Sequence, residues 1–208
     1  MNIITISREF GSGGREVGKR LADALGYTYY DREILTILAE KTQLDANYLD
    51  KVLEEGPLVQ QYPILFGRTF SILPYLSNPS LLANLTKMMK KIAISEHCVI
   101  VGRSANVILE EYNPLRIFVY ADMPSKIQRC RQRETEKTPK TDGEYEKKIR
   151  QVDKQRAKNH NMLSTYEWGD MRGYDLCLNT SSVNIKGMIP SLSEYCKKWF
   201  EHHPSVKG

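Results

Sequence analysis

The sequence has little of what metal sites and disulfide frameworks are built from. Its four cysteines include no CxxC pair, and its four histidines lie at no metal-binding spacing from them. We expect the cysteines to be buried thiols of a reducing compartment, and we expect no histidine-based metal site. No apolar run approaches the roughly 20 residues that a transmembrane helix needs, and the first residues lack the basic and apolar regions of a secretory leader. These absences predict a cytoplasmic protein that does not bind membranes.

Long runs of one charge are also absent. The net charge is +5, and the basic residues crowd between Lys126 and Lys158, where acidic residues are interleaved with them. A nucleic-acid-binding tract is more often purely basic. The composition therefore favours small anionic molecules over nucleic acid as ligands.

The order of the apolar segments predicts an α/β fold. Five short apolar runs alternate with segments of helical spacing, which is typical of a parallel sheet with helices on both faces. The 208 residues suffice for one such domain. The expected strands are residues 2–7, 27–30, 98–101, 115–120 and 176–178, and the expected helices are 15–25, 32–41, 81–94, 106–112, 125–133, 144–161 and 185–199.

Residues 44–82 depart from this alternation. Prolines interrupt them, and their apolar residues are scattered without a period. The stretch at 64–76 is too apolar for a free linker, so we expect short helices that form a small lobe. Its apolar side chains would be buried either within that lobe or in a homodimer.

A glycine-rich turn follows the first expected strand. Gly11, Ser12, Gly13 and Gly14 stand between that strand and a helix. Backbone N–H groups in such a turn can point at phosphate oxygens, and the helix adds the positive end of its dipole. The turn predicts a phosphate-binding loop, although the same small residues would also let a helix and a strand pack closely.

The turn lacks the lysine of the usual GxxxxGK[ST] motif. With the helix starting near residue 15, Gly14 stands at the lysine position and Glu16 at that of the magnesium-binding hydroxyl. Arg8, Arg15 and Lys19 are the candidates for the missing positive charge. Glu16 is either a metal ligand or a favourable acid in the first helical turn. A GxGxxG dinucleotide motif fits less well, because Glu16 replaces its third glycine.

Polar residues also follow two other strands at the carboxyl edge of the sheet, where ligands bind in open α/β folds. Arg103 comes directly after the third expected strand, and an arginine there has little reason to be only solvated. Asp31 ends the second strand, where it can bind a ligand or cap the next helix. Arginine suits phosphate sites because it stays charged and binds phosphate oxygens through two hydrogen bonds.

Several segments together resemble the cytidylate kinase-like proteins, a branch of the P-loop nucleoside monophosphate kinases. They are ISREFGSGGREVGKRLADALGYTYYD at residues 6–31, VIVGRSANVIL at 99–109, IFVYADMPSKIQRCRQR at 117–133, DKQRAKNH at 153–160 and WGDMRGYDLCLNTSSV at 168–183. The likeness spans most of the chain. It implies a P-loop NTPase-type three-layer fold with a five-stranded parallel sheet. Residues 1–208 would form one domain, with a helical acceptor-binding insertion at about 44–82 and a lid at about 129–160.

The resemblance implies an enzyme that transfers the γ-phosphoryl group of ATP, with Mg²⁺, to a nucleoside monophosphate such as CMP or dCMP. Phosphoryl transfer requires in-line positioning and positive charge on the moving phosphate. The residues expected at the site are Arg15, Arg129, Arg133 and Arg156 for catalysis, Arg8, Gly11, Ser12, Gly13, Gly14 and Lys19 for the nucleotide phosphates, Asp31, Arg103, Ser104 and Asp153 for the acceptor, and Glu16 for the metal.

Some of these assignments come from the resemblance alone. Asp153 and Arg156 match an acid–arginine pair beside the cytosine and phosphates, although a pair three residues apart is also typical of a solvated helix surface. Arg129 and Arg133 fall in the lid and share a helix face, because they are four residues apart. Arg131, between them, is expected to be solvated.

The sequence departs from the family's pattern at both sides of the site. Gly14 and Glu16 replace the lysine and the hydroxyl residue of the phosphate loop, and Ser104 replaces an aspartate near the acceptor base. These departures leave two alternatives open. One is a non-catalytic regulatory module that binds a nucleotide, and the other is a kinase for another small acceptor. A dinucleotide oxidoreductase fits least.

Overall fold

The structure is a computed structural model that describes residues 1–31, 79–134 and 140–203. The helix expected at 32–41, most of the lobe expected at 44–82 and the apolar stretch at 64–76 lie outside these ranges. So do residues 135–139 of the expected lid.

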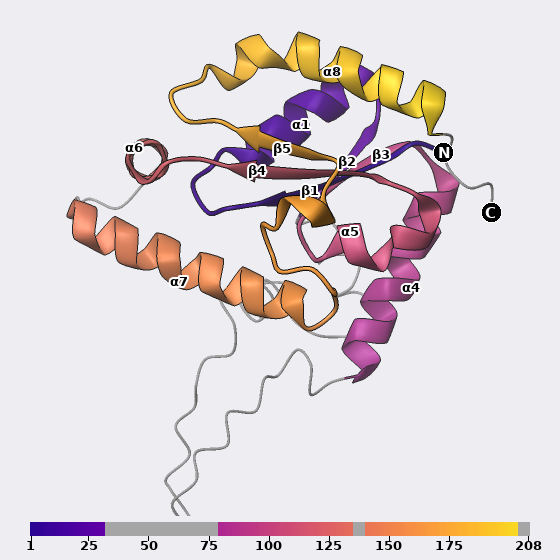
Figure 1. Cartoon of the computed structure of the whole chain (residues 1–208), viewed down its shortest axis with the longest axis horizontal. Helices are drawn as coiled ribbons and strands as arrows, with labels where there is room; N and C mark the ends of the chain where they lie inside the picture. The colour runs from indigo at the N-terminus through magenta and orange to yellow at the C-terminus, as the bar shows by residue number, and fades with distance from the viewer. Residues whose placement is uncertain (32–78, 135–139, 204–208) are drawn as a thin grey trace, which may run out of the picture.

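Five parallel strands form one sheet in the order β2–β3–β1–β4–β5 (Figure 1). They are β1 (Ile3–Arg8), β2 (Thr28–Tyr30), β3 (Cys98–Val101), β4 (Leu115–Tyr120) and β5 (Leu176–Asn179). β1 lies in the middle, with Ile6 opposite Val101 and Ile117. All six residues of β1 are buried, which explains its continuous apolar and β-branched run. The parallel, five-stranded α/β sheet that the sequence predicted is confirmed.

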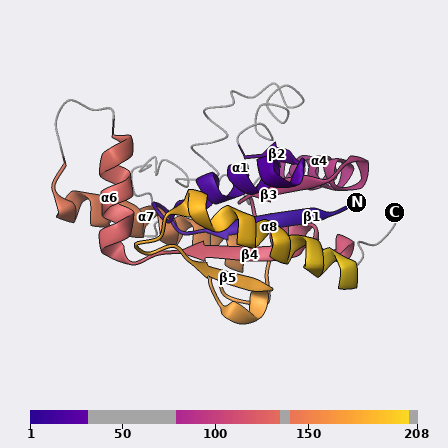
Figure 2. The same ribbon diagram turned by 90° about the horizontal axis from the view of Figure 1, so that it is seen from above.

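Helices cover both faces of this sheet (Figures 1 and 2). α1 (Gly14–Leu25) and α8 (Ile185–His202) lie on one face, and α4 (Pro79–Ser95), α5 (Ala105–Ile108) and α7 (Asp142–Asn161) lie on the other. α6 (Met123–Arg133) follows β4 and stands at the end of the sheet away from the two termini. The described part of the chain contains no helix with the length and apolar composition needed to span a bilayer.

Each face has its own buried core. Ile4 and Ile6 of β1 pack with Val17 and Leu21 of α1 and with apolar residues of α8. Ile3 points to the opposite face and packs with residues of α4 and α5. Burying a side chain of this size stabilises a fold by about 1.5–3 kcal/mol. The two cores therefore fix the strands, and with them the loops at the carboxyl edge.

Two sequence-based expectations differ from the structure. The helix expected at 106–112 is a short α5 followed by the 3₁₀ turn η1 (Glu110–Tyr112), which ends where Asn113 adopts a left-handed φ of 49°. A residue before proline is disfavoured in helical geometry, and Pro114 follows it. The expectation of four buried cysteines is confirmed for Cys98 and Cys196, but Cys130 is only half-buried and Cys177 is exposed. Cys177 lies on β5, an edge strand of the sheet.

Candidate phosphate-binding site

The loop between β1 and α1 has backbone geometry that favours glycine. Gly11 and Gly13 have φ angles of 77° and 82°, a left-handed conformation that costs glycine no steric clash. Gly13 is the N-cap of α1, and no side chain of the described residues caps this helix end through a hydrogen bond. The first N–H groups of α1 are therefore directed at the space in front of the loop, as in helix ends that bind anions.

Close packing requires glycine at 11, where a side chain would meet backbone, and restricts the space at 13, where it would meet the far end of Ile185. A Cβ atom on Gly11 would lie 2.9 Å from the backbone oxygen of Lys126, and one on Gly13 would lie 2.4 Å from Cδ1 of Ile185. α6 and the start of α8 thus pack closely against the loop from two sides. The packing explanation and the phosphate-loop explanation of these glycines are compatible.

The carbonyl oxygen of Ser12 anchors the loop to the end of β5. The hydroxyl of Thr180 donates a hydrogen bond to it at 2.6 Å, and Nη1 of Arg129 donates a second at 3.4 Å. Nη2 of Arg129 also donates to the carbonyl oxygen of Thr180 at 2.5 Å. Burial lowers the pKa of Arg129, and the nearby Arg133 lowers it further. α6 therefore brings a partly desolvated guanidinium group against the loop.

An ion cluster around the buried Lys126 side chain anchors the other side of the loop. Oδ1 of Asp153 accepts a hydrogen bond from the backbone N–H of Phe10 at 2.6 Å. The Nζ atom of Lys126 lies 2.9 Å from Oε2 of Glu9 and 3.4 Å from Oδ2 of Asp153. The Lys126 side chain is only 7% exposed. Burial raises the pKa of the Asp153 carboxyl group, and the bond from Phe10 and the Lys126 charge oppose that rise.

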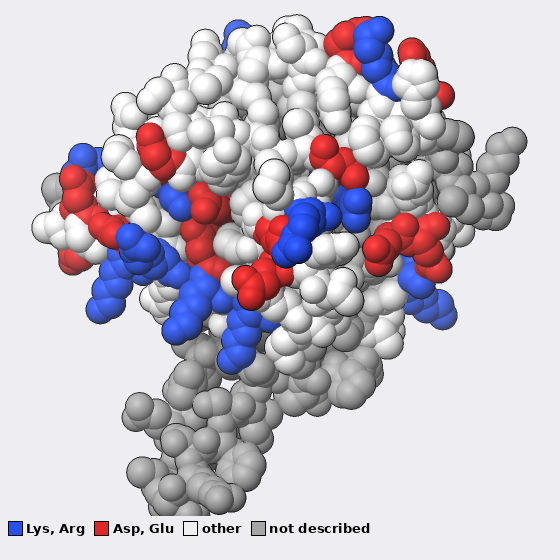
Figure 3. Space-filling model, viewed as in Figure 1, with Lys and Arg blue, Asp and Glu red and all other residues white. Residues whose placement is uncertain are grey.

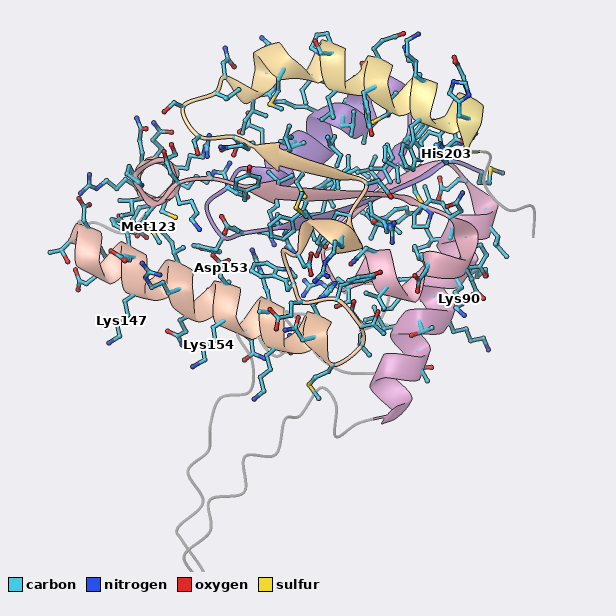
Figure 4. All side chains as sticks on the ribbon, in the orientation of Figure 1. Lys90, Met123, Lys147, Asp153, Lys154 and His203 are labelled. Atoms are coloured by element: carbon cyan, nitrogen blue, oxygen red, sulfur yellow. The ribbon has the colours of Figure 1, made fainter. Side chains whose placement is uncertain are left out.

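Arg156 makes a third contact between α7 and the loop. Its Nη1 atom donates to the carbonyl oxygen of Arg8 at 3.0 Å, and its guanidinium lies 5.7 Å from the centre of the Phe10 ring. Figure 4 shows Asp153 on the side of α7 that faces the sheet, whereas Lys147 and Lys154 point away from it. Asp153 and Arg156 are thus part of the loop's support and not a solvated surface pair.

A buried carboxylate gathers two arginines at the end of β2. Asp31 lies 2.7 Å from Nε of Arg15 and 3.9 Å from Nη2 of Arg8. The Arg8 side chain is 6% exposed, and that of Arg15 is 38% exposed. Arg8 also passes directly over Gly102, because a Cβ atom there would lie 2.0 Å from its Nη1 atom. This arginine therefore runs from the end of β1 across the ends of β3 and β2.

Backbone strain marks the turn after β3. Gly102, Arg103 and Ser104 have successive φ angles of 80°, 59° and 53°. A left-handed conformation costs a non-glycine residue on the order of 1 kcal/mol, and such residues cluster at functional sites. Both Arg103 and Ser104 are half-buried at the carboxyl edge, as the sequence predicted.

A cavity of about 190 Å³ opens beside the loop. Six basic and two acidic residues line it, so its charge favours an anionic ligand. It brings together many of the residues that the sequence singled out, from the loop, from α6 and from α7. These are Arg8, Gly11, Gly13, Gly14, Arg15, Arg129, Arg133 and Arg156.

Other predicted site residues lie outside this cavity. Asp31, Arg103 and Ser104 are grouped at the ends of β2 and β3, on the side of Arg8. Lys19 is 66% exposed and lies 3.9 Å from Asp23, away from the loop. The sequence predicts Lys19 as a phosphate ligand, but α1 directs its side chain away from the loop.

The carboxylate of Glu16 is paired with two arginines. Its Oε1 atom accepts from Nε of Arg20 at 2.9 Å, and its Oε2 atom lies 3.6 Å from Nη2 of Arg133. The described residues contain no group of three or more His, Cys, Asp or Glu side chains arranged for a metal ion. The contact with Arg133 joins α1 to the end of α6.

Arg131 is turned away from the cavity. It is 53% exposed and forms an ion pair with Asp142. Arg129 and Arg133 share the face that lines the cavity, as their spacing predicted. Basic side chains also gather over α7 with acidic ones between them (Figure 3), in line with the interleaved charges of the sequence.

Several residues of the site were not identified from the sequence. Glu9, Phe10 and the buried Lys126 form the support of the loop, and Cys130, Glu134, Tyr145 and Lys148 complete the lining of the cavity. One signal was present, because Lys126, Cys130 and Arg133 recur at spacings of three and four residues in α6. That spacing places Lys126 on the helix face that carries Arg129 and Arg133.

Comparison with known proteins gives a consistent result. A family model described as the cytidylate kinase-like family matches residues 3–182. Cytidylate kinases of two Streptococcus suis strains, 05ZYH33 and 98HAH33, are each 25% identical over 225 residues, and these alignments cover 94% of this chain and 96% of theirs.

Solved structures agree with the family match. A structure of an uncharacterized protein from Eubacterium ventriosum ATCC 27560 has a TM-score of 0.67 at 26% identity and covers 95% of this chain and 99% of that one. A shikimate kinase from Bacteroides thetaiotaomicron has a TM-score of 0.54 at 15% identity, with 96% of this chain and 98% of that one covered. A shikimate kinase from Acinetobacter baumannii has a TM-score of 0.53 at 12% identity, with 95% of this chain and 94% of that one covered. At such identities the shikimate kinases share the fold alone, which confirms the P-loop-type architecture. With a family model that matches most of its length, the chain belongs to the cytidylate kinase-like family.

Proposed function

We propose that the protein is an ATP-dependent phosphotransferase that transfers the γ-phosphoryl group to a nucleoside monophosphate, with a cytidylate or deoxycytidylate acceptor as the first candidate. The observation that carries this proposal is the arginine-lined cavity against a glycine-rich loop at the carboxyl edge of the sheet. Phosphoryl transfer needs little covalent help from the protein, since positioning and positive charge account for most of the catalysis. The cavity offers both.

The donor side of the site is the loop and the face of α6 beside it. The amide groups at the start of α1 would hold the phosphates, and Arg129 and Arg133 would neutralise charge on the moving group. Arg129 is already fixed by its bonds to the loop and to Thr180, so it would need little reorganisation. Arg133 is 52% exposed, and we propose that it closes on the ligand.

The acceptor side is the group of residues at the ends of β2 and β3. Arg103 would bind the acceptor phosphate, and the strained turn around it supports a functional role. Ser104 would contact the acceptor in place of the aspartate of true cytidylate kinases. The resemblance also places Asp153 near the acceptor. Because its oxygens already bind Phe10 and Lys126, we propose that it acts on the reaction by holding the loop.

The residues present fit the phosphates of ATP better than they fit a protein-bound metal. The cavity has an excess of cations, whereas Glu16 is paired with Arg20 and Arg133. Mg²⁺ usually binds through substrate phosphates and keeps several waters. We propose that Mg²⁺ enters with the nucleotide, to which it supplies charge neutralisation. Glu16 would bind this Mg²⁺ only after its ion pair with Arg133 is broken.

A regulatory module that binds a nucleotide without catalysis is the second candidate. The specific observation that favours it is the loss of the lysine and the hydroxyl residue, at Gly14 and Glu16. A kinase for another small acceptor is favoured only by Ser104. These candidates differ in whether any acceptor accelerates turnover.

The test is ADP production from ATP and Mg²⁺ with CMP, dCMP, UMP, AMP, GMP, dTMP or no acceptor. The proposal expects turnover that depends on CMP or dCMP and that falls when Arg103 is replaced by alanine. Turnover no faster with any acceptor than without one, together with ATP-dependent thermal stabilisation, would contradict it and favour the regulatory module. Turnover with a different acceptor of the panel would keep the phosphotransferase and replace the cytidylate assignment.

A further inference from the structure

We propose that Arg8 takes the place of the lysine that the phosphate loop lacks, and that residue 14 is glycine because the Arg8 side chain fills the space where that lysine would begin. The identity of the ligand, a nucleotide triphosphate group, rests on the proposed function. The geometric part of the proposal rests on the contacts of Arg8 alone.

The first step is steric. A Cβ atom at Gly14 would lie 2.5 Å from Cβ of Arg8 and 2.8 Å from its Cγ. Real Cβ atoms essentially never approach other atoms this closely. The two contacting atoms are the root of the Arg8 side chain, and they belong to a fully buried strand that pairs on both sides. The clash cannot be removed by rotating the far end of a flexible side chain, so a lysine at 14 and an arginine at 8 exclude each other.

The second step is the path of the Arg8 side chain. It leaves the end of β1, passes over Gly102 and ends 3.9 Å from Oδ1 of Asp31. This path lies between the donor loop and the acceptor residues at the ends of β2 and β3. Phosphoryl transfer is accelerated by positive charge that lies between the two substrates and stabilises the phosphoryl group in transit. Arg8 therefore brings its cation to that junction from the strand, where a lysine would bring it from the helix.

The third step compares the three candidates for this charge. Lys19 is exposed and turned away. Arg15 lines the cavity, but its side chain is 38% exposed and belongs to the rim. Arg8 lines the same cavity and is 6% exposed, so its charge is already desolvated and oriented. A fixed charge in a water-poor site stabilises a transition state more strongly than a mobile one.

The steric step is tested by a double-mutant cycle on thermal stability. The four proteins are the wild type, Gly14→Ala, Arg8→Ala and the double variant. Gly14→Ala is expected to lower the Tm of the wild type clearly and that of Arg8→Ala only somewhat less, because Arg8→Ala removes the Cγ contact at 2.8 Å and keeps the closer Cβ contact at 2.5 Å. The Cγ contact disappears in Arg8→Ala, although the Cβ contact stays, so the cycle is repeated with Arg8→Gly. Additive losses in both cycles would overturn the steric step.

The charge step is tested by calorimetric binding of inorganic tripolyphosphate and of ATP. Loss of a charge-assisted contact to phosphate is expected to weaken binding roughly tenfold to hundredfold in Arg8→Met, with partial recovery in Arg8→Lys. The decisive protein is Arg8→Gly/Gly14→Lys, which carries the lysine in its usual place. It is expected to bind triphosphate more tightly than Arg8→Gly. Arg150→Met removes an exposed arginine that is paired with Glu146 and is expected to bind like the wild type.

The outcomes separate this inference from the proposed function. Unchanged triphosphate binding by Arg8→Met, or no gain in Arg8→Gly/Gly14→Lys over Arg8→Gly, would overturn the role of Arg8 even if the wild type is an active kinase. Conversely, a wild type that phosphorylates no acceptor would end the kinase proposal, while Arg8 is still tested by binding. Where Arg8→Met does not fold, as judged by circular dichroism, Arg8→Lys and the lysine-restored double variant decide the question.

Discussion

Oδ2 of Asp31 lies 2.7 Å from Nε of Arg15, so the end of β2 is tied directly to the first turn of α1. The second carboxylate oxygen lies 3.9 Å from Nη2 of Arg8. One buried acid thereby holds two cations between the glycine-rich loop and the turn after β3. The capping role that the sequence allowed for Asp31 concerns a helix outside the described residues, but its contacts with Arg8 and Arg15 stand independently of that role.

Asp31→Asn is expected to destabilise the fold and to weaken activity. Removing one partner of a fully buried ion pair costs about 3–5 kcal/mol, and we expect on the order of 2 kcal/mol here because Arg15 is partly solvated. Urea unfolding measures this loss. Asp23→Asn, on the exposed face of α1 next to Lys19, is the matched control and is expected to change the unfolding free energy by less than about 0.5 kcal/mol. Equal stabilities of the two variants would contradict the role of Asp31.

Lys126→Met tests the buried support of the loop. The substitution leaves the carboxylates of Glu9 and Asp153 close together without their shared cation. Breaking a fully buried pair costs about 3–5 kcal/mol, and we expect on the order of 2 kcal/mol in the free energy of unfolding here because both carboxylates are partly solvated. In Lys126→Met/Asp153→Asn one of the uncompensated charges is gone, and part of that loss is expected to return. A cost for Lys126→Met below about 1 kcal/mol would show that the cluster contributes little to the fold.

Catalysis supplies an independent readout of the same cluster. Because Asp153 and Lys126 contact the loop and not the cavity, a change there is expected to misplace the donor phosphates without removing a ligand group. In an active wild type, Asp153→Asn should therefore raise the KM for ATP more than the KM for the acceptor. A larger effect on the acceptor would instead favour the direct acceptor contact that the resemblance implies for Asp153.

Much of the architecture could be predicted because it depends on local patterns. The run at 98–101 is buried throughout and the run at 115–120 is buried over most of its length, and the strands have these same bounds. The start of α6 is also encoded locally, because the Asp122 side chain accepts from the backbone N–H of Ser125 at 2.8 Å and Pro124 stands in the first turn. Such signals involve residues within one turn of each other, and the sequence displays them directly.

The contacts that define the site are of a different kind. Lys126 meets Glu9 across 117 positions of the chain, and Arg156 meets Arg8 across 148. Hydrophobic periodicity identifies which residues are buried in a core, but it does not pair charges that are far apart in sequence. The proposed choice of Arg8 over Arg15 and Lys19 depends on its contact with Gly14 and on the exposure of the three side chains, which only the three-dimensional structure shows.

Arg103→Ala is expected to lower the affinity for the acceptor more than the affinity for ATP. Arg103 lies at the end of β3 and does not line the cavity beside the loop. Losing a bidentate contact to a phosphate would weaken acceptor binding by roughly tenfold or more. Separate titrations with ATP and with CMP measure the two affinities, and equal losses of both would count against the assignment. Arg131→Ala, on the outer face of α6, is the control for loss of one positive charge.

His160 links the stability of the protein to pH. It is 3% exposed on the inner face of α7, and its Nε2 atom lies 3.1 Å from the side-chain amide nitrogen of Asn106, whose Oδ1 accepts from Ser7 at 3.3 Å. This chain of contacts joins α7 to α5 and to β1. Burial lowers the pKa of His160 below its ordinary value.

The sign of the pH effect follows from that shift. Between the folded and the unfolded pKa of His160, the unfolded chain binds more protons, so the free energy of unfolding rises with pH. Stability from this group is complete above the ordinary histidine pKa of about 6.5 and is lost as the pH falls below it. We therefore expect the urea midpoint of the wild type to fall from about pH 8 to about pH 5.5 more steeply than that of His160→Gln. Replacement of the exposed His202 by glutamine should leave the wild-type slope unchanged, and parallel slopes for the wild type and His160→Gln would show that His160 is not the titrating group.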